Sequence, residues 1–201
     1  MKHIKEYNKY VDPFDEDDWD EIEPLEPDGT FFTWLKIKYP DESKWKNKKS
    51  IDCRNSKLTD LIGIEKLINL TNLYCQNNQL KELDISKNIN LEYLYCYHNE
   101  LKELDVTNNI NLTNLSCLHN QLTELNLSKN IKLKDLYCNN NQLTELDLSK
   151  NVSLIKLYCH YNQLTDLDIN KNINLRYLAC NYNQLKELDL SKNVNLKYKN
   201  I

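Results

Sequence analysis

The stretch Leu133-Lys-Asp-Leu-Tyr-Cys138-Asn-Asn-Asn-Gln-Leu143-Thr-Glu-Leu-Asp-Leu148-Ser-Lys-Asn-Val-Ser153 contains one complete unit of a repeated pattern. Its cysteine recurs at residues 53, 75, 96, 117, 138, 159 and 180, with a spacing of 22 residues once and then of 21 residues five times. Neither a catalytic site nor a disulfide framework requires such regular spacing. A fixed period of this length indicates a solenoid in which each unit stacks on the next.

Residues one period apart form columns, and each column is named below by its member in the quoted stretch. Complete units begin at Leu70, Leu91, Leu112, Leu133, Leu154 and Leu175 and fill residues 70–195; an irregular unit (48–69) precedes them and a terminal strand (196–201) follows. Apolar residues alternate with polar ones around each cysteine, as strands require. The columns that we expect to point inward are those of Leu133, Leu136, Cys138, Leu143, Leu146, Leu148 and Val152.

The segment Leu-x-x-Leu-x-Cys-x-x-Asn-x-Leu resembles the leucine-rich repeat, and its period with Leu-Asp-Leu in the second half resembles the short bacterial IRREKO type. This resemblance implies an α/β-type solenoid, a horseshoe or right-handed superhelix, with a short strand that turns on a buried asparagine. Because Asp, Ser and two Asn occupy the second half of each unit, we expect short extended or 3₁₀ segments on the convex side and a parallel sheet on the concave side. The residues of one unit that match the pattern are Leu70, Leu73, Cys75, Asn78, Leu80, Leu83, Asp84 and Ile85.

The two ends differ from the repeats. Residues 1–28 carry three Lys against eleven Asp and Glu, which predicts an acidic tail or arm. Residues 29–47 contain a helical pattern that Thr30 caps and that Pro40 interrupts, and we expect it to cover the first rung of the repeat domain, residues 48–201. At the other end Lys199 replaces a leucine, which discourages pairing of the last strand, so we expect a monomer that allows a weak dimer through this end.

Several classes of function are disfavoured. Inward cysteines and outward histidines lie on opposite faces of the same strands, which argues against an enzyme, and two glycines in the whole chain exclude a glycine-rich phosphate loop. We expect no cofactor, no metal, no nucleic acid and no membrane partner, although His98 and His119 are neighbours in one column. The acidic Asp147 column is expected to be neutralised by the Lys150 column. A start without an apolar signal core and seven core cysteines predict a cytoplasmic protein. Richness in Asn, Lys and Ile indicates an AT-rich coding genome, so we expect the cytoplasm of a bacterial or virus-infected cell.

The surface of the predicted sheet is where the repeats differ. Nine of thirteen tyrosines lie there, beside histidines and an exposed leucine, around a dip at Ser116. Tyrosine also stiffens strands, but this composition is typical of a recognition surface. We therefore predict a non-catalytic scaffold that binds a protein partner; alternatively, the solenoid is a passive spacer and residues 12–28 are the binding element. The candidate residues are Tyr74, Tyr93, Tyr95, Tyr97, His98, Leu118, His119, Tyr137, Tyr158, His160, Tyr161, Tyr177 and Tyr182.

Overall fold

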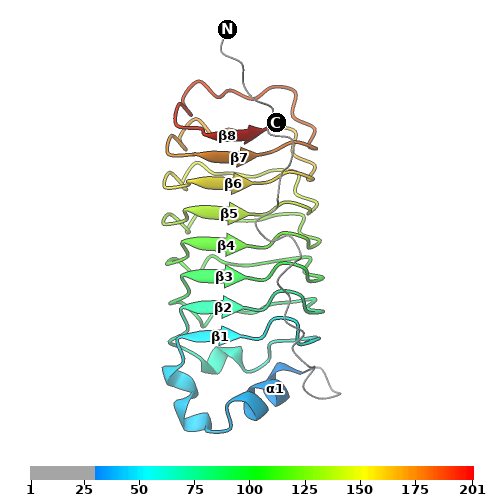
Figure 1. Cartoon of the computed structure of the whole chain (residues 1–201), viewed down its shortest axis with the longest axis vertical. Coiled ribbons are helices and arrows are strands. Elements are labelled where there is room, and N and C mark those ends of the chain that lie inside the picture. The colour runs from blue at the N-terminus through cyan, green and yellow to red at the C-terminus, as the bar shows by residue number, and fades with distance from the viewer. Residues whose placement is uncertain (1–29) are drawn as a thin grey trace.

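The protein is a stack of short rungs that rises from a helical cap (Figure 1). This computed structural model describes residues 30–201. Each rung contributes one short strand, and the strands pair in parallel and in sequence order within one eight-stranded sheet, which confirms the predicted solenoid. The strands are β1 (Ser50–Asp52), β2 (Asn72–Tyr74), β3 (Tyr93–Tyr95), β4 (Asn114–Ser116), β5 (Asp135–Tyr137), β6 (Lys156–Tyr158), β7 (Tyr177–Ala179) and β8 (Tyr198–Asn200).

The irregular first unit keeps the register of the sheet. Ile51 of β1 pairs with Leu73 of β2, although 22 residues separate them. The extra residue lies within residues 61–64, just before the 3₁₀ helix η2 (Ile64–Lys66), where Gly63 turns with a φ of +106°. A side chain is rarely compatible with this backbone conformation, so glycine allows the insertion without displacing the strand.

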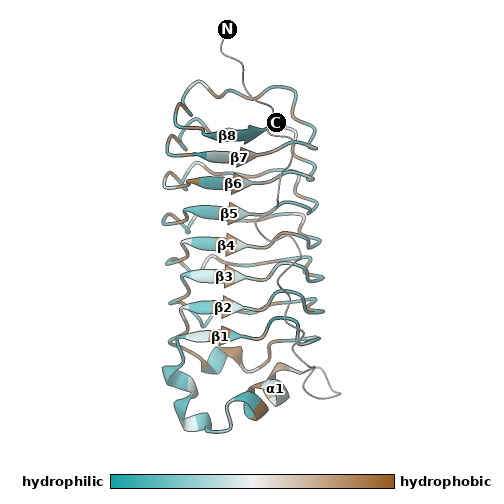
Figure 2. Cartoon of the chain, viewed as in Figure 1, coloured by the Kyte–Doolittle hydropathy of each residue, from teal (hydrophilic) through white to brown (hydrophobic). Residues whose placement is uncertain are grey.

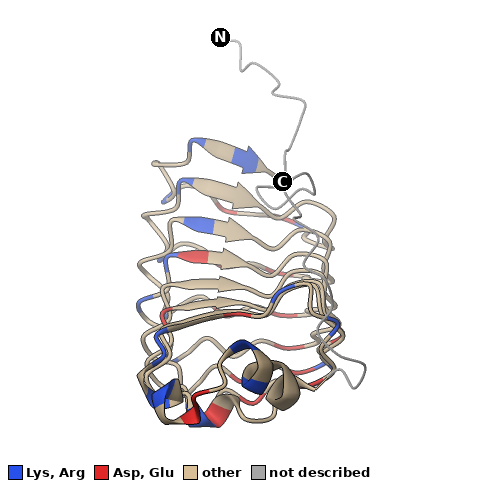
Figure 3. Ribbon diagram, turned by 60° about the horizontal axis from the view of Figure 1, so that its bottom comes forward, with Lys and Arg blue, Asp and Glu red and all other residues tan. Residues whose placement is uncertain are grey.

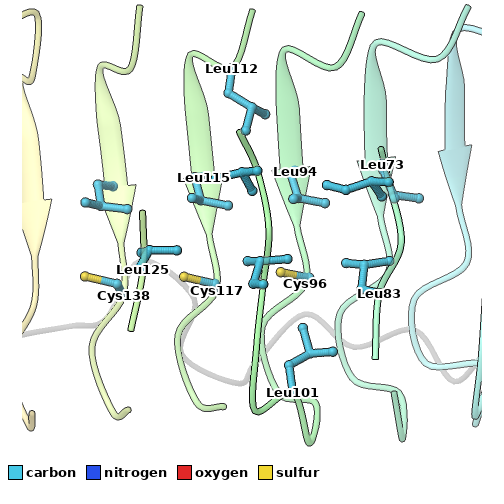
Figure 4. Packing of buried hydrophobic residues seen from close by; sticks show 14 of the residues in the cluster. Leu73, Leu83, Leu94, Cys96, Leu101, Leu112, Leu115, Cys117, Leu125 and Cys138 are labelled. Carbon is cyan, nitrogen blue, oxygen red and sulfur yellow. The ribbon is translucent and has the colours of Figure 1, made fainter. Parts of the chain in front are cut away.

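Leucines and cysteines fill the space between the sheet and the convex side. The Leu133, Leu136, Cys138 and Leu143 columns are buried through the repeats, except that Leu185 of the last unit is partly buried. All seven cysteines are free, and burial raises the pKa of each thiol, for Cys117 to about 12. The cysteine column is therefore a row of small apolar core residues. Figure 4 shows two of these rows, formed by Leu73, Leu94 and Leu115 and by Cys96, Cys117 and Cys138.

The Asn141 column is buried at the turn after the strand, as predicted, and it also joins neighbouring rungs. The Asn141 amide donates to the carbonyl oxygens of Cys117 (3.0 Å) and Cys138 (3.1 Å). Its Oδ1 accepts from the Leu122 N–H at 3.0 Å. One side chain therefore satisfies backbone groups on two successive rungs, where unpaired groups would be costly.

A second asparagine column was missed by the sequence analysis. Asn151 is fully buried and donates to the carbonyl oxygens of Leu127 (3.1 Å) and Asn130 (2.9 Å) of the preceding unit. Because Asn151 faces inward, its neighbour Val152 points outward and is 47% exposed, so the prediction that this column is inward was wrong. The exposed row consists of Ile68, Ile89, Ile110, Ile131, Val152, Ile173 and Val194.

Turns hold the acidic column of the convex side. The Asp147 carboxylate accepts from the Ser149 N–H at 2.8 Å, and this hydrogen bond is the first cause of its lowered pKa. Lys150 makes a smaller contribution to the lowered pKa. Within residues 30–201 no ion pair joins the Asp147 column to the Lys150 column. The predicted mutual neutralisation is therefore not what orients these carboxylates.

The cap consists of α1 (Phe31–Lys38) and the 3₁₀ helix η1 (Glu42–Asn47), which lie beyond the β1 end of the stack (Figure 1). Thr30 occupies the N-cap position. Trp34 and Trp45 are each 2% exposed and contribute to the same hydrophobic core as the leucines. Figure 2 shows apolar segments on α1 at this end. The rings thus cover leucines that would otherwise face water.

The predicted acidic arm, residues 1–28, lies outside the described residues. In the part of the chain that the structure describes, no helix has the length and apolar character needed to cross a membrane.

Candidate binding face

A row of side chains projects from the turn that follows each strand. The Asn140 column has positive φ at every rung, for example +53° at Asn140, +51° at His119 and +52° at Tyr161. The next residue in each turn belongs to the Asn141 column, and its amide donates to backbone carbonyls of the turn. These hydrogen bonds stabilise a left-handed backbone conformation that costs ~1–2 kcal/mol for a residue other than glycine.

Stacked rings occupy this row. The His98 and His119 rings lie 4.3 Å apart at 10°, and the Tyr161 and Tyr182 rings lie 4.2 Å apart at 10°. These four side chains are exposed. Rungs spaced ~4.8 Å apart allow flat rings to stack face to face. The row therefore presents aromatic edges to a partner.

Beside the row, a second hydrophobic cluster lies on the strand side of the sheet. It contains Tyr97, Leu118, Tyr137, Tyr158 and Ala179, each at most 7% exposed. The Tyr137 and Tyr158 rings stack at 5.0 Å and 8°. Burial, first among several causes, raises the pKa of Tyr158 to about 12.

This cluster corrects several predictions. Leu118 was predicted to be exposed and is 1% exposed; Ser116, predicted as the bottom of a dip, is fully buried. His160 is also buried at 5% exposure. Rings on adjacent rungs contact one another, and sequence alternation alone does not show how much surface such contacts remove. The candidate residues that keep surface are Tyr74, Tyr93, Tyr95 and Tyr177, which are half-buried, and His98, His119, Tyr161 and Tyr182, which are exposed.

Two buried polar groups in this cluster have no hydrogen-bond partner. Asn139 is 0% exposed, and neither its Nδ2 nor its Oδ1 is bonded. The Oγ atom of Ser116, on the preceding rung, is likewise buried and unbonded. Desolvating an amide without a hydrogen bond costs ~1–3 kcal/mol in proteins. Asn139 and Ser116 thus keep hydrogen-bonding capacity that is not used within residues 30–201.

Charge is distributed unevenly along the face. Near the first rungs Arg54 pairs with Asp52 at 3.0 Å. Toward the other end Lys156 pairs with Asp135 at 3.2 Å. Figure 3 shows Lys and Arg segments, in blue, on strands toward that end. No ion pair within residues 30–201 involves the exposed Lys134, Arg176 or Lys197. The half of the face from β5 to β8 is therefore cationic.

The sheet separates the cysteine thiols from the stacked histidines of this face. The thiols are buried behind the strands, and the stacked histidines lie on the opposite side. Among the described residues no group of three or more His, Cys, Asp or Glu is placed to hold a metal ion. His119 Nε2 lies 3.1 Å from the Asn140 amide nitrogen. This face offers stacking, hydrogen bonding and cations, which are means of binding.

Comparison with known proteins supports a repeat scaffold. No family model matches the chain. A stretch of 37 residues, 18% of the chain and 4% of the relative, is 51% identical to Internalin J of Listeria monocytogenes. Over 79% of the chain, the structure resembles the functional domain of InlJ from the same organism, which includes a cysteine ladder, with a TM-score of 0.50 and 36% identity. The chain is a cysteine-containing leucine-rich-repeat protein.

Other solved leucine-rich-repeat structures share the fold at lower identity. The protein LIC12759 of Leptospira interrogans has a TM-score of 0.62 at 23% identity over 78% of the chain, and internalin C2 of Listeria monocytogenes has 0.58 at 24% over 79%. The chain spans 82% of internalin C2, but only about half the length of the InlJ domain (45%) and of LIC12759 (49%).

Proposed function

We propose that this leucine-rich-repeat protein is a non-catalytic scaffold that binds a protein partner across the strand side of its sheet. The observation that carries the proposal is the placement of aromatic side chains. They gather on the one face whose residues differ between units, whereas the leucine, cysteine and asparagine columns hardly change. Aromatic residues are enriched at the energetic centres of protein interfaces.

The structure divides the proposed surface into a floor and a rim. The floor is the buried cluster around Leu118 and Tyr137, which gives the surface its shape. The rim comprises the exposed rings of His98, His119, Tyr161 and Tyr182. Tyr161 and Tyr182 stack on each other and are exposed, so their outer edges can contact a partner. We therefore expect Tyr161 and Tyr182 to contribute more to binding than to folding.

Affinity capture with purified protein tests the proposal. The variant Tyr161→Ala/Tyr182→Ala removes the exposed stacked pair and is expected to weaken capture of a partner by about 2 kcal/mol or more, about thirtyfold in Kd. The matched control is Ile131→Ala/Ile173→Ala, which removes two comparably exposed apolar side chains from the Val152 column.

Equal capture by the wild type and the Tyr161→Ala/Tyr182→Ala variant would reject this surface. Loss of capture by the control alone would assign binding to the Val152 column instead. Circular dichroism of both variants shows whether the fold is retained.

Compartment and oligomeric state are part of the proposal. Buried thiols with raised pKa values stay reduced in either an oxidising or a reducing compartment, so the cytoplasmic location rests on the sequence. Cell fractionation tests it. For the oligomeric state we propose a monomer, and a mass measured by light scattering that rises with concentration would contradict this.

A further inference from the structure

We propose that residues 12–28 of this same chain bind the face described above, with their acidic part, residues 15–21, on its β5–β8 half, where they occupy the partner's place. The inference rests on the proposed function, because it takes the same face to be the binding surface. Three properties of the described residues support it: an unsatisfied amide, an aromatic cluster and unpaired cations.

The buried amide of Asn139 requires a partner with particular chemistry. Its Nδ2 needs an acceptor and its Oδ1 needs a donor, and both are unbonded. A peptide group in an extended chain presents a C=O and an N–H and can serve both atoms. The adjacent Ser116 hydroxyl adds a further donor and acceptor. This site therefore suits a polypeptide backbone rather than a purely apolar side chain.

Residues 12–28 carry the side chains that the aromatic cluster would contact. Phe14, Trp19, Ile22 and Leu25 are spread along the segment, and three prolines disfavour a helix there. The half-buried rings around the cluster, Tyr95, Tyr177 and Tyr198, retain surface for them. Contact between such side chains and rings removes apolar area from water, which favours docking.

The negative charge of residues 12–28 favours binding to the β5–β8 half of the face. Residues 12–28 contain ten Asp and Glu and no Lys or Arg. Lys134, Arg176 and Lys197 have no ion pair within residues 30–201 and lie on the rungs from β5 to β8. The first rungs offer Arg54 already paired with Asp52. An acidic segment is therefore attracted to the far half of the face.

The chain before Thr30 is long enough to reach the cationic rungs. The described chain begins at Thr30, beside the cap at the β1 end. From β1 to β7 the face extends six rung spacings, ~29 Å at ~4.8 Å each. Nine extended residues span ~30 Å at ~3.3 Å per residue, so residues 15–21, which carry six acids, can reach the cationic rungs.

Tryptophan fluorescence in the full-length chain tests the inference, because Trp34 and Trp45 are each 2% exposed and Trp19 is the third tryptophan. Acrylamide quenching then reports mainly on Trp19. In the wild type we expect Trp19 to be shielded, with quenching that increases as salt screens the contact over ~10 Å at 0.1 M. We expect Arg176→Glu/Lys197→Glu to increase the quenching constant at low salt by about twofold or more, because like charges now repel the segment.

Two matched controls accompany this variant. Lys171→Glu/Lys192→Glu makes the same charge change at exposed lysines of the convex turns of neighbouring units and should leave quenching unchanged. Asn139→Ala should increase quenching because it removes the bonding amide, whereas Asn140→Gly, one residue on, should not. Circular dichroism verifies that each variant is folded.

Each other outcome overturns the inference. Equal quenching in the wild type and in the Arg176→Glu/Lys197→Glu and Asn139→Ala variants would show that the segment does not use this face. Protection lost only in Lys44→Glu/Lys46→Glu would place it on the cap, and protection that depends on protein concentration would indicate a second copy. Partner capture by the Tyr161→Ala/Tyr182→Ala variant is measured separately, so failure of the cis contact leaves the proposed function tested on its own.

Discussion

Replacing Asn141 by alanine should be among the most destabilising single changes in the chain, whereas replacing its neighbour Asn140 by glycine should change stability little. The two residues are adjacent and chemically identical. Asn141 makes hydrogen bonds to the carbonyls of Cys117 and Cys138 and to the Leu122 N–H, all within the core. Asn140 is half-buried in a left-handed turn that glycine adopts readily.

The magnitude follows from one group left unpaired and two hydrogen bonds lost. In Asn141→Ala the buried Leu122 N–H loses its acceptor, whereas the carbonyls of Cys117 and Cys138 each keep a donor, the amide of Asn120 and of Asn162. The unsatisfied N–H costs ~1–3 kcal/mol and each of the two lost hydrogen bonds ~1 kcal/mol, so we expect a decrease of about 3–5 kcal/mol in the free energy of unfolding. For a protein of this size that corresponds to a decrease in Tm of roughly 6–20 °C, at ~2–4 °C per kcal/mol. Asn140→Gly should change the free energy of unfolding by about 0.5 kcal/mol or less.

Thermal and urea unfolding followed by circular dichroism measure the global effect. Because repeat arrays can unfold in more than one step, amide hydrogen exchange at Leu122 provides a local measurement. Exchange there should accelerate in Asn141→Ala and not in Asn140→Gly. Equal shifts of the two midpoints, with unchanged protection at Leu122, would refute the assignment of Asn141 as the link between rungs.

Three further predictions concern the core, the thiols and pH. Leu146→Asp places a carboxylate at a 7% exposed position and should destabilise the protein by several kcal/mol in urea unfolding. Glu145→Lys, at an exposed position, should leave the unfolding midpoint nearly unchanged. Equal midpoints of the two variants would show that the assigned register is wrong. A thiol reagent should label no cysteine rapidly in the native protein and all seven after denaturation. Cys180, whose pKa burial raises to about 11, should react first on partial unfolding. Mass spectrometry identifies the order of labelling, and rapid labelling of Cys138 in the native protein would contradict the buried column. Burial, with a smaller effect of His119, lowers the pKa of His160 from 6.5 to about 4. Between these pH values the unfolded state binds a proton at His160 and the folded state does not, so the free energy of unfolding should fall as pH decreases from about 6.5 to about 4. His160→Gln should remove this part of the pH dependence. An unchanged pH profile in that variant would assign the effect to other groups.

The repeat pattern was sufficient to predict the architecture. The period places the same residue types in register on successive rungs, and alternation around each cysteine marks a strand. Leu136 and Cys138 were predicted to be buried, and they are. The Asn141 column and the helical cap also followed from local rules, because a turn needs a side chain to satisfy its backbone and an open stack needs a cover.

Other features were decided only when the rungs stacked. Asn139, Asn140 and Asn141 are identical and consecutive, yet one is buried without partners, one lies in a left-handed turn and one links two rungs. Leu118 was expected on the surface and Val152 in the core, and their positions are the reverse. Periodicity specifies which way a residue points within its own rung. How much water it meets, and which backbone groups it satisfies, depend on the rungs above and below, and only the tertiary structure brings those together.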